Sequence, residues 1–306
     1  MAKKPPAKKN PVPVSSGRPA GLFTWLAVGL VVVVVAALVI VKVVSGSPTT
    51  TTTGTFQATD ATTVSELTTI PSNVFNTVGI TSSVVPASPP IQLKGQSLLT
   101  GTSTSGAKVP QIFYLGAEYC PYCAAQRWAT IIALSRFGTW KNLGNTTSSS
   151  IDIYANTPTF TFVNARYSSK YLAFESVEEL NNVYNSTTKS YGALQKPTAA
   201  EQSIFSKYDT STYIKTMTPA DNGSIPFISF ANQFVQSGAS YTPAALAGLT
   251  RSQIAAGLSN ATSPVTAAIV ASANYQTAAL CKLTKEQPAN VCTSGGVLAA
   301  KKAMKL

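Results

Sequence analysis

Histidine is absent from this 306-residue chain, methionine occurs three times and cysteine four times. Without a histidine after the second cysteine, a Cys-x-x-Cys motif cannot attach haem, and a histidine- and methionine-rich copper site is disfavoured as well. Charged residues are also scarce, at 11% of the sequence, against roughly 25% in typical soluble proteins. Serine, threonine and asparagine take their place, so neutral polar groups must keep the folded part in solution.

The net charge of +12 does not indicate nucleic-acid binding, because the basic residues do not form a binding surface in the sequence. Six of the 23 lysines and arginines lie in the first 42 residues. Beyond position 42, the remaining 17 basic residues stand against 11 acidic ones. No basic run lies beside aromatic residues before the short lysine-rich C-terminal tail, and we therefore expect no nucleic-acid partner.

A long apolar run near the N-terminus predicts a transmembrane helix over residues 21–44. Gly21–Val41 is a run of 21 residues without a charge, and a helix of this length spans about 31 Å, the thickness of the hydrocarbon core of a bilayer. Trp25 lies near one end, where an interfacial anchor is expected. A buried helix and a cleaved signal peptide are the alternatives, but Lys42 directly after the run favours an uncleaved anchor.

The rest of the chain is organised around this predicted anchor. Residues 1–20 form a basic tail that we expect to be disordered and to remain in the cytoplasm. The C-terminal domain then lies outside the cytoplasm, where disulfides persist. Residues 45–65 are rich in serine and threonine and are predicted to be a linker. The folded domain is expected over residues 66–306, with a helical insertion at about residues 171–218 and a C-terminal helical extension.

Two cysteines separated by two residues follow a predicted strand, Val109–Leu115, and open a predicted helix. In this context the sequence Cys120-Pro121-Tyr122-Cys123 is typical of a redox dithiol. Cys120 is expected at the N-cap, where free backbone N–H groups and the helix dipole favour a thiolate, and Pro121 fits the first helical position. We therefore expect the sulfur of Cys120 to be exposed, ionised and nucleophilic, with Cys123 as the resolving thiol.

Other uses of this cysteine pair stay open. A structural disulfide between residues three apart closes so short a loop that it adds little stability. A zinc site shared with Cys281 and Cys292 is disfavoured, because those two cysteines lack the short spacing of a second zinc half-site. A metal-delivery domain is a further alternative. We expect no bound metal and no cofactor.

Cys281 and Cys292 have ten residues between them and are expected to form a structural disulfide in an oxidising compartment. Closing a loop of this size would stabilise the protein by about 3 kcal/mol in the chain-entropy model. Two buried free thiols, or a shuttle that passes electrons to the dithiol, are the alternatives.

Further elements are predicted after the dithiol. A second strand is expected over Thr159–Asn164, where phenylalanines alternate with polar residues. Ser224–Phe230 is expected to be a strand that starts at a proline, with Gln233–Gln236 as its hairpin partner. Arg127 and Arg136 lie on the helix that begins at the dithiol and are expected to be solvated. Arg127 is one turn beyond the second cysteine, where its charge would modestly favour a thiolate.

This order of elements resembles the thioredoxin fold, and Cys-Pro-Tyr-Cys is the active-site sequence typical of glutaredoxins. A helical block before the proline strand is similar to the layout of the periplasmic disulfide oxidoreductases. The resemblance implies a cis-proline that faces the dithiol, at Pro226. It also implies that Ile225, the residue before this proline, pairs with a substrate chain through its backbone.

A closer resemblance lies around the dithiol itself. The stretch Gly116–Ala129, followed by Ala133–Gly138, resembles a membrane-anchored family known as domain of unknown function 929. The resemblance extends over roughly residues 66–300 in the order of elements. It implies an α/β, thioredoxin-like fold with a helical insertion, preceded by one transmembrane helix, and it implies redox chemistry without an assigned substrate.

These features predict a thiol–disulfide oxidoreductase that is anchored in the membrane and acts outside the cytoplasm on protein thiols or disulfides. Oxidation or isomerisation is favoured over reduction, and a redox partner in the membrane is expected. The expected catalytic residues are Cys120 and Cys123. The residues expected to contact the substrate are Pro121, Tyr122, Ile225 and Pro226. The alternative is a non-catalytic, thioredoxin-like binding module at the cell surface, with a structural cysteine pair.

Overall fold

A mixed six-stranded sheet positions the segment that carries the dithiol. The computed structural model describes residues 56–80 and 86–306. Its strands are β1 (Ile91–Gln92), β2 (Thr100–Thr102), β3 (Lys108–Gly116), β4 (Thr139–Lys141), β5 (Gly144–Thr147), β6 (Pro158–Thr161), β7 (Arg166–Ser168), β8 (Ala173–Glu178), β9 (Leu180–Asn185), β10 (Ser190–Ala193), β11 (Phe227–Phe230) and β12 (Phe234–Ser237). Its α-helices are α2 (Ala61–Thr68), α3 (Ser72–Val78), α4 (Pro121–Ser135), α5 (Ala199–Tyr208), α6 (Arg251–Gly257), α7 (Pro264–Leu283), α8 (Ala289–Cys292) and α9 (Gly295–Met304).

The central strand of this sheet is β3. It pairs in parallel with β8, and antiparallel with β11 and, through its first residues, with β2. Beyond β11 the sheet continues through β12 to β1. Parallel and antiparallel pairs thus occur in one sheet, so the chain has a mixed α/β fold, in agreement with the coarse fold class that the sequence predicts.

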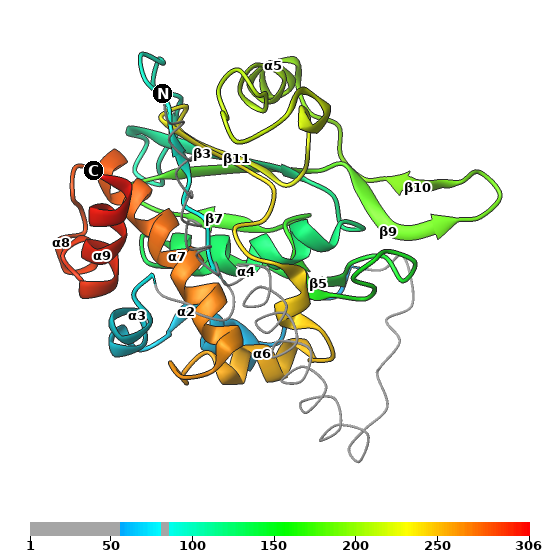
Figure 1. The fold of residues 1–306 in the computed structure, drawn as a ribbon, viewed down its shortest axis with the longest axis horizontal. Coiled ribbons are helices and arrows are strands. Elements are labelled where there is room, and N and C mark those ends of the chain that lie inside the picture. The colour runs from blue at the N-terminus through cyan, green and yellow to red at the C-terminus, as the bar shows by residue number, and fades with distance from the viewer. Residues whose placement is uncertain (1–55, 81–85) are drawn as a thin grey trace, which may run out of the picture. The chain divides into compact units, whose positions relative to one another are not determined.

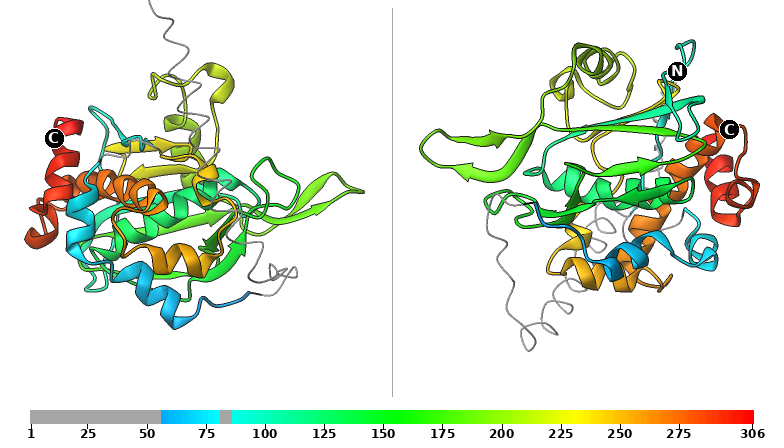
Figure 2. Two further views of the ribbon diagram at one scale, coloured as in Figure 1. Left: turned by 60° about the horizontal axis from the view of Figure 1, so that its bottom comes forward. Right: turned by 180° about the vertical axis from the view of Figure 1, so that it is seen from behind.

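Alternate side chains of β3 enter two separate cores. Ile112 and Tyr114 belong to the larger core, which includes α4 and α7. Phe113 and Leu115 belong to a smaller core, against which residues of α5 pack. Figure 1 shows α5 on one side of the sheet and α4 with α7 on the other, and the turned views in Figure 2 agree. The near-continuous apolar run of β3 therefore follows from burial on both faces.

Helix α4 lies beneath the sheet and is buried from Cys123 to Leu134. The apolar side chains of this helix, among them Trp128 and Ile131, are fully buried. Each side chain of this size contributes roughly 1.5–3 kcal/mol when it leaves water. The chain turns sharply after the helix at Gly138, where a Cβ would overlap the carbonyl oxygen of Ser168, so only glycine allows this approach.

Three two-stranded sheets of the described residues lie outside the main sheet, and they are β4 with β7, β5 with β6, and β9 with β10. The β9–β10 hairpin projects away from the sheet, as Figures 1 and 2 both show. Its first residues stay close to the dithiol segment, because the N–H of Glu118 donates to the carbonyl of Leu180 at 2.9 Å.

The segment 171–218 differs from the predicted helical insertion. Only α5 is an α-helix there, while residues 173–193 form β8, β9 and β10. The residues include Phe174, Val177 and Tyr184, whose aromatic and β-branched side chains favour extended backbone. In β8, pairing with β3 then outweighs the helix-like spacing of polar and apolar residues in this segment.

The predicted second strand, Thr159–Asn164, is correct only in part. Residues 158–161 form β6, but this strand pairs antiparallel with β5 and does not enter the main sheet. The parallel neighbour of β3 is β8, which the sequence reading assigned to the insertion. Phe160 and Phe162 are nevertheless buried, because Phe160 packs against Trp128 of α4 and Phe162, just after β6, packs against Tyr114 of β3.

The folded domain begins earlier than residue 66. Asp60 caps α2 by accepting a hydrogen bond from the N–H of Thr63 at 2.8 Å, so the predicted linker over residues 45–65 extends too far. The first two helices, α2 and α3, are separated at Pro71. Pro71 disfavours helical backbone in the residue before it, which accounts for the break.

The elements after residue 223 agree better with expectation. The hairpin of β11 and β12 follows Pro226 and ends at Gly238. Helix α6 starts after Thr250, which forms a capping box with Gln253. The C-terminal segment is largely helical, with α7, α8 and α9 in succession.

No helix within residues 56–80 and 86–306 has both the length and the hydrophobicity needed to cross a membrane. The predicted tail over residues 1–20, the predicted transmembrane helix over residues 21–44 and the first part of the predicted linker lie outside the described residues.

The packing of α9 against α3 gives a test of the fold. A Cβ at Gly296 would overlap the carbonyl oxygen of Phe75 and lie 2.5 Å from Nδ2 of Asn274, whereas the nearest atom to a Cβ at Gly295 is 3.3 Å away. We expect Gly296→Ala to lower the free energy of unfolding by about 1–3 kcal/mol. The matched control Gly295→Ala should cost nothing, since alanine favours the helix. Equal urea midpoints for the two variants would contradict this packing.

Candidate active site

The dithiol lies at the junction between β3 and α4. Cys120 is the N-cap residue of α4, with φ of −76° and ψ of 121°, and its sulfur accepts a hydrogen bond from the backbone N–H of Cys123 at 3.3 Å. Pro121 occupies the first turn, where its missing N–H is not needed. The structure therefore confirms the predicted placement of both residues at the start of the helix.

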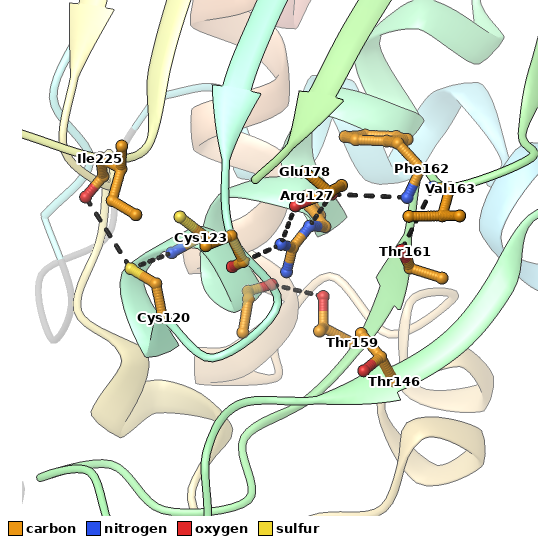
Figure 3. Close-up of polar contacts among 12 residues, drawn as sticks. Cys120, Cys123, Arg127, Thr146, Thr159, Thr161, Phe162, Val163, Glu178 and Ile225 are labelled. Atoms are coloured by element: carbon orange, nitrogen blue, oxygen red, sulfur yellow. Dashed lines mark hydrogen bonds and ion pairs between the residues drawn. The ribbon is translucent and has the colours of Figure 1, made fainter. Parts of the chain in front are cut away.

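The segment before β11 brings a second element to this sulfur. The peptide bond between Ile225 and Pro226 is cis, as the resemblance implied. The Cys120 thiol faces the carbonyl oxygen of Ile225, with a distance of 3.8 Å between the two atoms. Figure 3 shows this carbonyl on one side of Cys120 and Cys123 on the other. Residues more than 100 positions apart in the sequence thus meet at one sulfur atom.

The two cysteine thiols have opposite pKa shifts. A hydrogen bond from the Cys123 thiol is the main cause that lowers the pKa of Cys120, and the backbone N–H of Cys123 adds to it against the opposing effect of burial. Burial is the main cause that raises the pKa of Cys123 well above its usual value. Of the two thiols, Cys120 therefore loses its proton more readily, in the direction that its N-cap position predicted.

The prediction that the Cys120 sulfur is exposed is wrong. Cys120 is only 5% exposed and Cys123 is fully buried. The segment before β11 covers the Cys120 sulfur through Ile225, which is itself half-buried. The N-terminus of a helix sets the ionisation of a thiol, but its accessibility depends on which other segments pack over it, and the sequence around the motif does not contain that information.

Both cysteines are free thiols in this structure. Below them, Arg127 is fully buried, so the expectation that it is solvated is wrong. Its Nε and Nη2 donate to the two carboxylate oxygens of Glu178 at 2.8 and 2.6 Å, and Nη2 also donates to the carbonyl of Ala117 at 2.8 Å. Figure 3 shows this bidentate pair behind Cys123. Its guanidinium also contributes to the lowered pKa of Cys120.

The ion pair between Arg127 and Glu178 is the functional feature that sequence reading missed. The two residues are 51 positions apart, on α4 and at the end of β8. An arginine inside a helix whose other residues are nearly all apolar, alanine or small was a signal that its charge is paired in the core. Assignment of residues 171–218 to a helical insertion hid its partner.

Two buried polar atoms next to this pair have no hydrogen-bond partner among the described residues, and they are Tyr114 OH and Arg127 Nη1. A Cβ on Gly116 would meet both the Tyr114 hydroxyl and the Cys123 sulfur, so these two groups lie beside the same glycine. Burial raises the pKa of Tyr114 well above its usual value, so its hydroxyl stays protonated. It is therefore a neutral group close to the buried thiol.

The tyrosines next to the two cysteines in the sequence pack against tyrosines of other segments. Tyr122, between the cysteines, is 41% exposed and contacts Tyr154 edge to face, with 6.0 Å between the ring centroids. Tyr119 stacks on Tyr191 of β10, with 4.3 Å between the centroids and 5° between the rings. The residues around the dithiol therefore come from the motif itself, from β10 and from the segment 148–157, and the sequence alone does not predict that the last two lie there.

One of these segments, residues 148–157, carries two exposed isoleucines. Ile151 is 60% exposed and Ile153 is 79% exposed. The N–H of Ser149 donates to the carbonyl of Tyr119 at 2.8 Å, which holds the segment against the residue before the first cysteine. Exposed aliphatic side chains therefore lie next to the tyrosines around the dithiol, while the charged pair of Arg127 and Glu178 lies in the core.

The other two cysteines form the predicted disulfide. Cys281 at the end of α7 and Cys292 at the end of α8 are joined, with 5.6 Å between their Cα atoms, and both are fully buried. The bond links these two helices within the larger core. Pairing of these cysteines removes the alternative of two buried free thiols.

Within the residues that the structure describes, no group of three or more histidine, cysteine, aspartate or glutamate side chains could hold a metal ion. The four predicted substrate-contacting residues are brought together with the dithiol, since Pro121 and Tyr122 belong to its helix turn and Ile225 and Pro226 lie across from it.

Fold and site together define a mixed α/β protein with a Cys-Pro-Tyr-Cys dithiol at the start of a buried helix. The model of the family described as Domain of unknown function (DUF929) matches residues 100–282, which is more than half of the chain, and the chain belongs to this family. The match extends from β2 almost to the end of α7 and includes the dithiol. Comparison with curated proteins and with solved structures found no match.

Alkylation of the reduced protein tests the division between the two thiols. Only a thiolate reacts with iodoacetamide, so the pH midpoint for modification of Cys120 should lie below that of the same thiol in the urea-unfolded protein. Cys123, with its raised pKa, should stay unmodified in the folded protein over the same range. Peptide mass spectrometry measures both. A Cys120 midpoint at or above the unfolded value would contradict the arrangement.

Removal of one partner tests the buried ion pair. Arg127→Leu leaves the Glu178 carboxylate without a counter-charge in the core, and we expect a loss of about 3–5 kcal/mol in the free energy of unfolding. The double variant Arg127→Leu with Glu178→Leu should lose less than the single variant, because no charge stays buried. Chemical denaturation measures the free energy of unfolding of both variants. A double variant less stable than the single one would contradict the role of Arg127 as the counter-charge of Glu178.

Proposed function

We propose that the protein is a thiol–disulfide oxidoreductase built on a thioredoxin-like sheet. The observation that carries the proposal is the position of the Cys120 sulfur, at the N-cap of α4 and 3.8 Å from the carbonyl oxygen before a cis-proline. The sheet order β8, β3, β11, β12, with β8 parallel and β11 antiparallel to β3, supports the resemblance to the thioredoxin fold.

The chemistry proceeds through a mixed disulfide. In the oxidising direction, a substrate thiolate attacks the Cys120 sulfur of the Cys120–Cys123 disulfide, and Cys123 leaves as a thiolate that takes up a proton. A second substrate thiolate then attacks the substrate sulfur and releases Cys120. The substrate loses two electrons and gains a disulfide, while the protein is left as the dithiol. In the reducing direction the same steps run in reverse.

A substrate chain would lie along Ile225. This residue precedes β11, and its backbone forms no hydrogen bond with another backbone group of the described residues. Its N–H can therefore pair with an extended chain whose cysteine sulfur reaches Cys120. Tyr122 is exposed beside the dithiol and offers an aromatic surface to the same chain.

Oxidation or isomerisation is the favoured direction. At a pH above the lowered pKa of Cys120, the thiolate stabilises the reduced dithiol, and this makes the disulfide form the better oxidant. The buried disulfide between Cys281 and Cys292 fits an oxidising compartment. The proposal places the domain outside the cytoplasm, held by the predicted anchor at residues 21–44, with a membrane redox partner that reoxidises the dithiol.

A second candidate function is supported by the burial of the pair. With Cys120 only 5% exposed and Cys123 fully buried, a non-catalytic, thioredoxin-like binding module with a permanent Cys120–Cys123 disulfide remains an alternative. Resistance of Cys120 to alkylation after mild reduction would favour this module, because an oxidoreductase must admit a substrate sulfur to that atom.

An insulin reduction assay tests the favoured function. In the presence of dithiothreitol, the purified protein should accelerate insulin precipitation, and Cys120→Ser should lose at least tenfold of this activity because the attacking sulfur is gone. Cys123→Ser keeps the attacking sulfur and should accumulate a mixed disulfide with a protein substrate, visible on a non-reducing gel. Equal activity of the wild type and Cys120→Ser would end the proposal.

A further inference from the structure

A cavity of about 160 Å³ lies among α2, α3, α4, α8 and the segment that joins α8 to α9. Its walls include the buried side chains of Leu67, Phe75 and Ile132. Ser72 and Asn290 also line it and are exposed, so they mark its open side. An apolar cavity of about 150 Å³ accommodates a molecule as large as benzene.

A guanidinium group forms part of the wall. Arg136, the C-cap residue of α4, donates through Nη1 to Asn274 Oδ1 at 3.2 Å and to Thr277 Oγ1 at 3.4 Å, and through Nη2 to Ser294 Oγ at 2.9 Å. Its Cζ atom lies 4.2 Å from the centroid of the Phe75 ring. All of these partners are neutral.

No carboxylate compensates this charge within the described part of the chain, where the two ion pairs involve Arg127 and Lys301. Burial alone lowers the pKa of Arg136 to about 10, and no neighbouring charge opposes this effect. The group is therefore still a cation at neutral pH. Its place at the C-terminus of α4 offsets part of the cost through the helix dipole, but a buried cation is usually paired with an anion.

We propose that this cavity binds a small organic carboxylate with an apolar body, in the size range of benzoate. The carboxylate would accept hydrogen bonds from the Arg136 guanidinium on the cavity wall, and the apolar body would replace water against Leu67, Phe75 and Ile132. A bare inorganic anion would satisfy the charge but would leave these apolar walls wet. The site is formed by residues other than those of the dithiol and does not depend on the redox proposal.

Titration of the full-length protein with benzoate and with benzamide, its neutral analogue, tests this site. Isothermal titration calorimetry should give one benzoate per chain, and benzoate should raise the melting temperature with increasing concentration. Benzamide should bind at least tenfold more weakly, because it carries no charge for Arg136. Equal affinity for the two compounds, or sulfate binding as tightly as benzoate, would overturn the assignment.

Two kinds of variant locate the binding. Arg136→Gln removes the charge and should weaken benzoate binding at least tenfold, while Arg136→Lys should restore part of it. Since loss of Arg136 contacts can also unsettle the fold, Val291→Phe offers a second route, because Val291 lines the cavity and the added ring fills it while Arg136 stays. Ala289→Phe is the matched control, because Ala289 is exposed and does not line the cavity. This variant should bind benzoate as tightly as the wild type does. Wild-type affinity in Val291→Phe would overturn the proposal.

Discussion

The pairing of β3 with β11 is the constraint on which the site depends. Leu115 of β3 lies opposite Phe227 of β11, so the end of one strand is held beside the start of the other. Beyond Leu115 the chain turns into α4 with Cys120 at its N-cap, and before Phe227 it passes through the cis Ile225–Pro226 bond. One strand register therefore brings a thiol and a backbone carbonyl within 3.8 Å.

A second contact fixes the helix from below. The bidentate pair of Arg127 with Glu178 joins α4 to the last residue of β8, and β8 runs parallel to β3 on the side opposite β11. The segment before β11 thus contacts Cys120 itself, while β8 holds the helix that begins with the dithiol. Because the pair is buried, water and salt screen the charge of Arg127 only weakly. This charge helps to lower the pKa of Cys120, so the same arginine contributes to the packing of the core and to the ionisation of the thiol.

Local rules predicted the elements whose signal lies within a few residues. Capping and helix-dipole arguments placed Cys120 and Pro121 correctly at the start of α4. The same kind of reasoning failed for residues 171–218, where pairing with β3 determines the structure, and for Arg127, whose partner is 51 positions away. Local sequence patterns do not encode contacts between residues so far apart in the chain. Strand pairing can also outweigh a helix-like spacing of polar and apolar residues.

By itself, the sequence predicted where the dithiol begins a helix and that Cys281 pairs with Cys292, since these follow from short-range backbone chemistry and cysteine spacing. The α/β class followed from the order of the predicted elements and the family that this order resembles. Only the tertiary structure decided that the Cys120 sulfur is covered, that Arg127 is paired with Glu178 in the core, and that Arg136 lines a cavity without a counter-charge among the described residues. The reason is that burial and charge compensation are properties of packed segments, and packing is set by the whole fold.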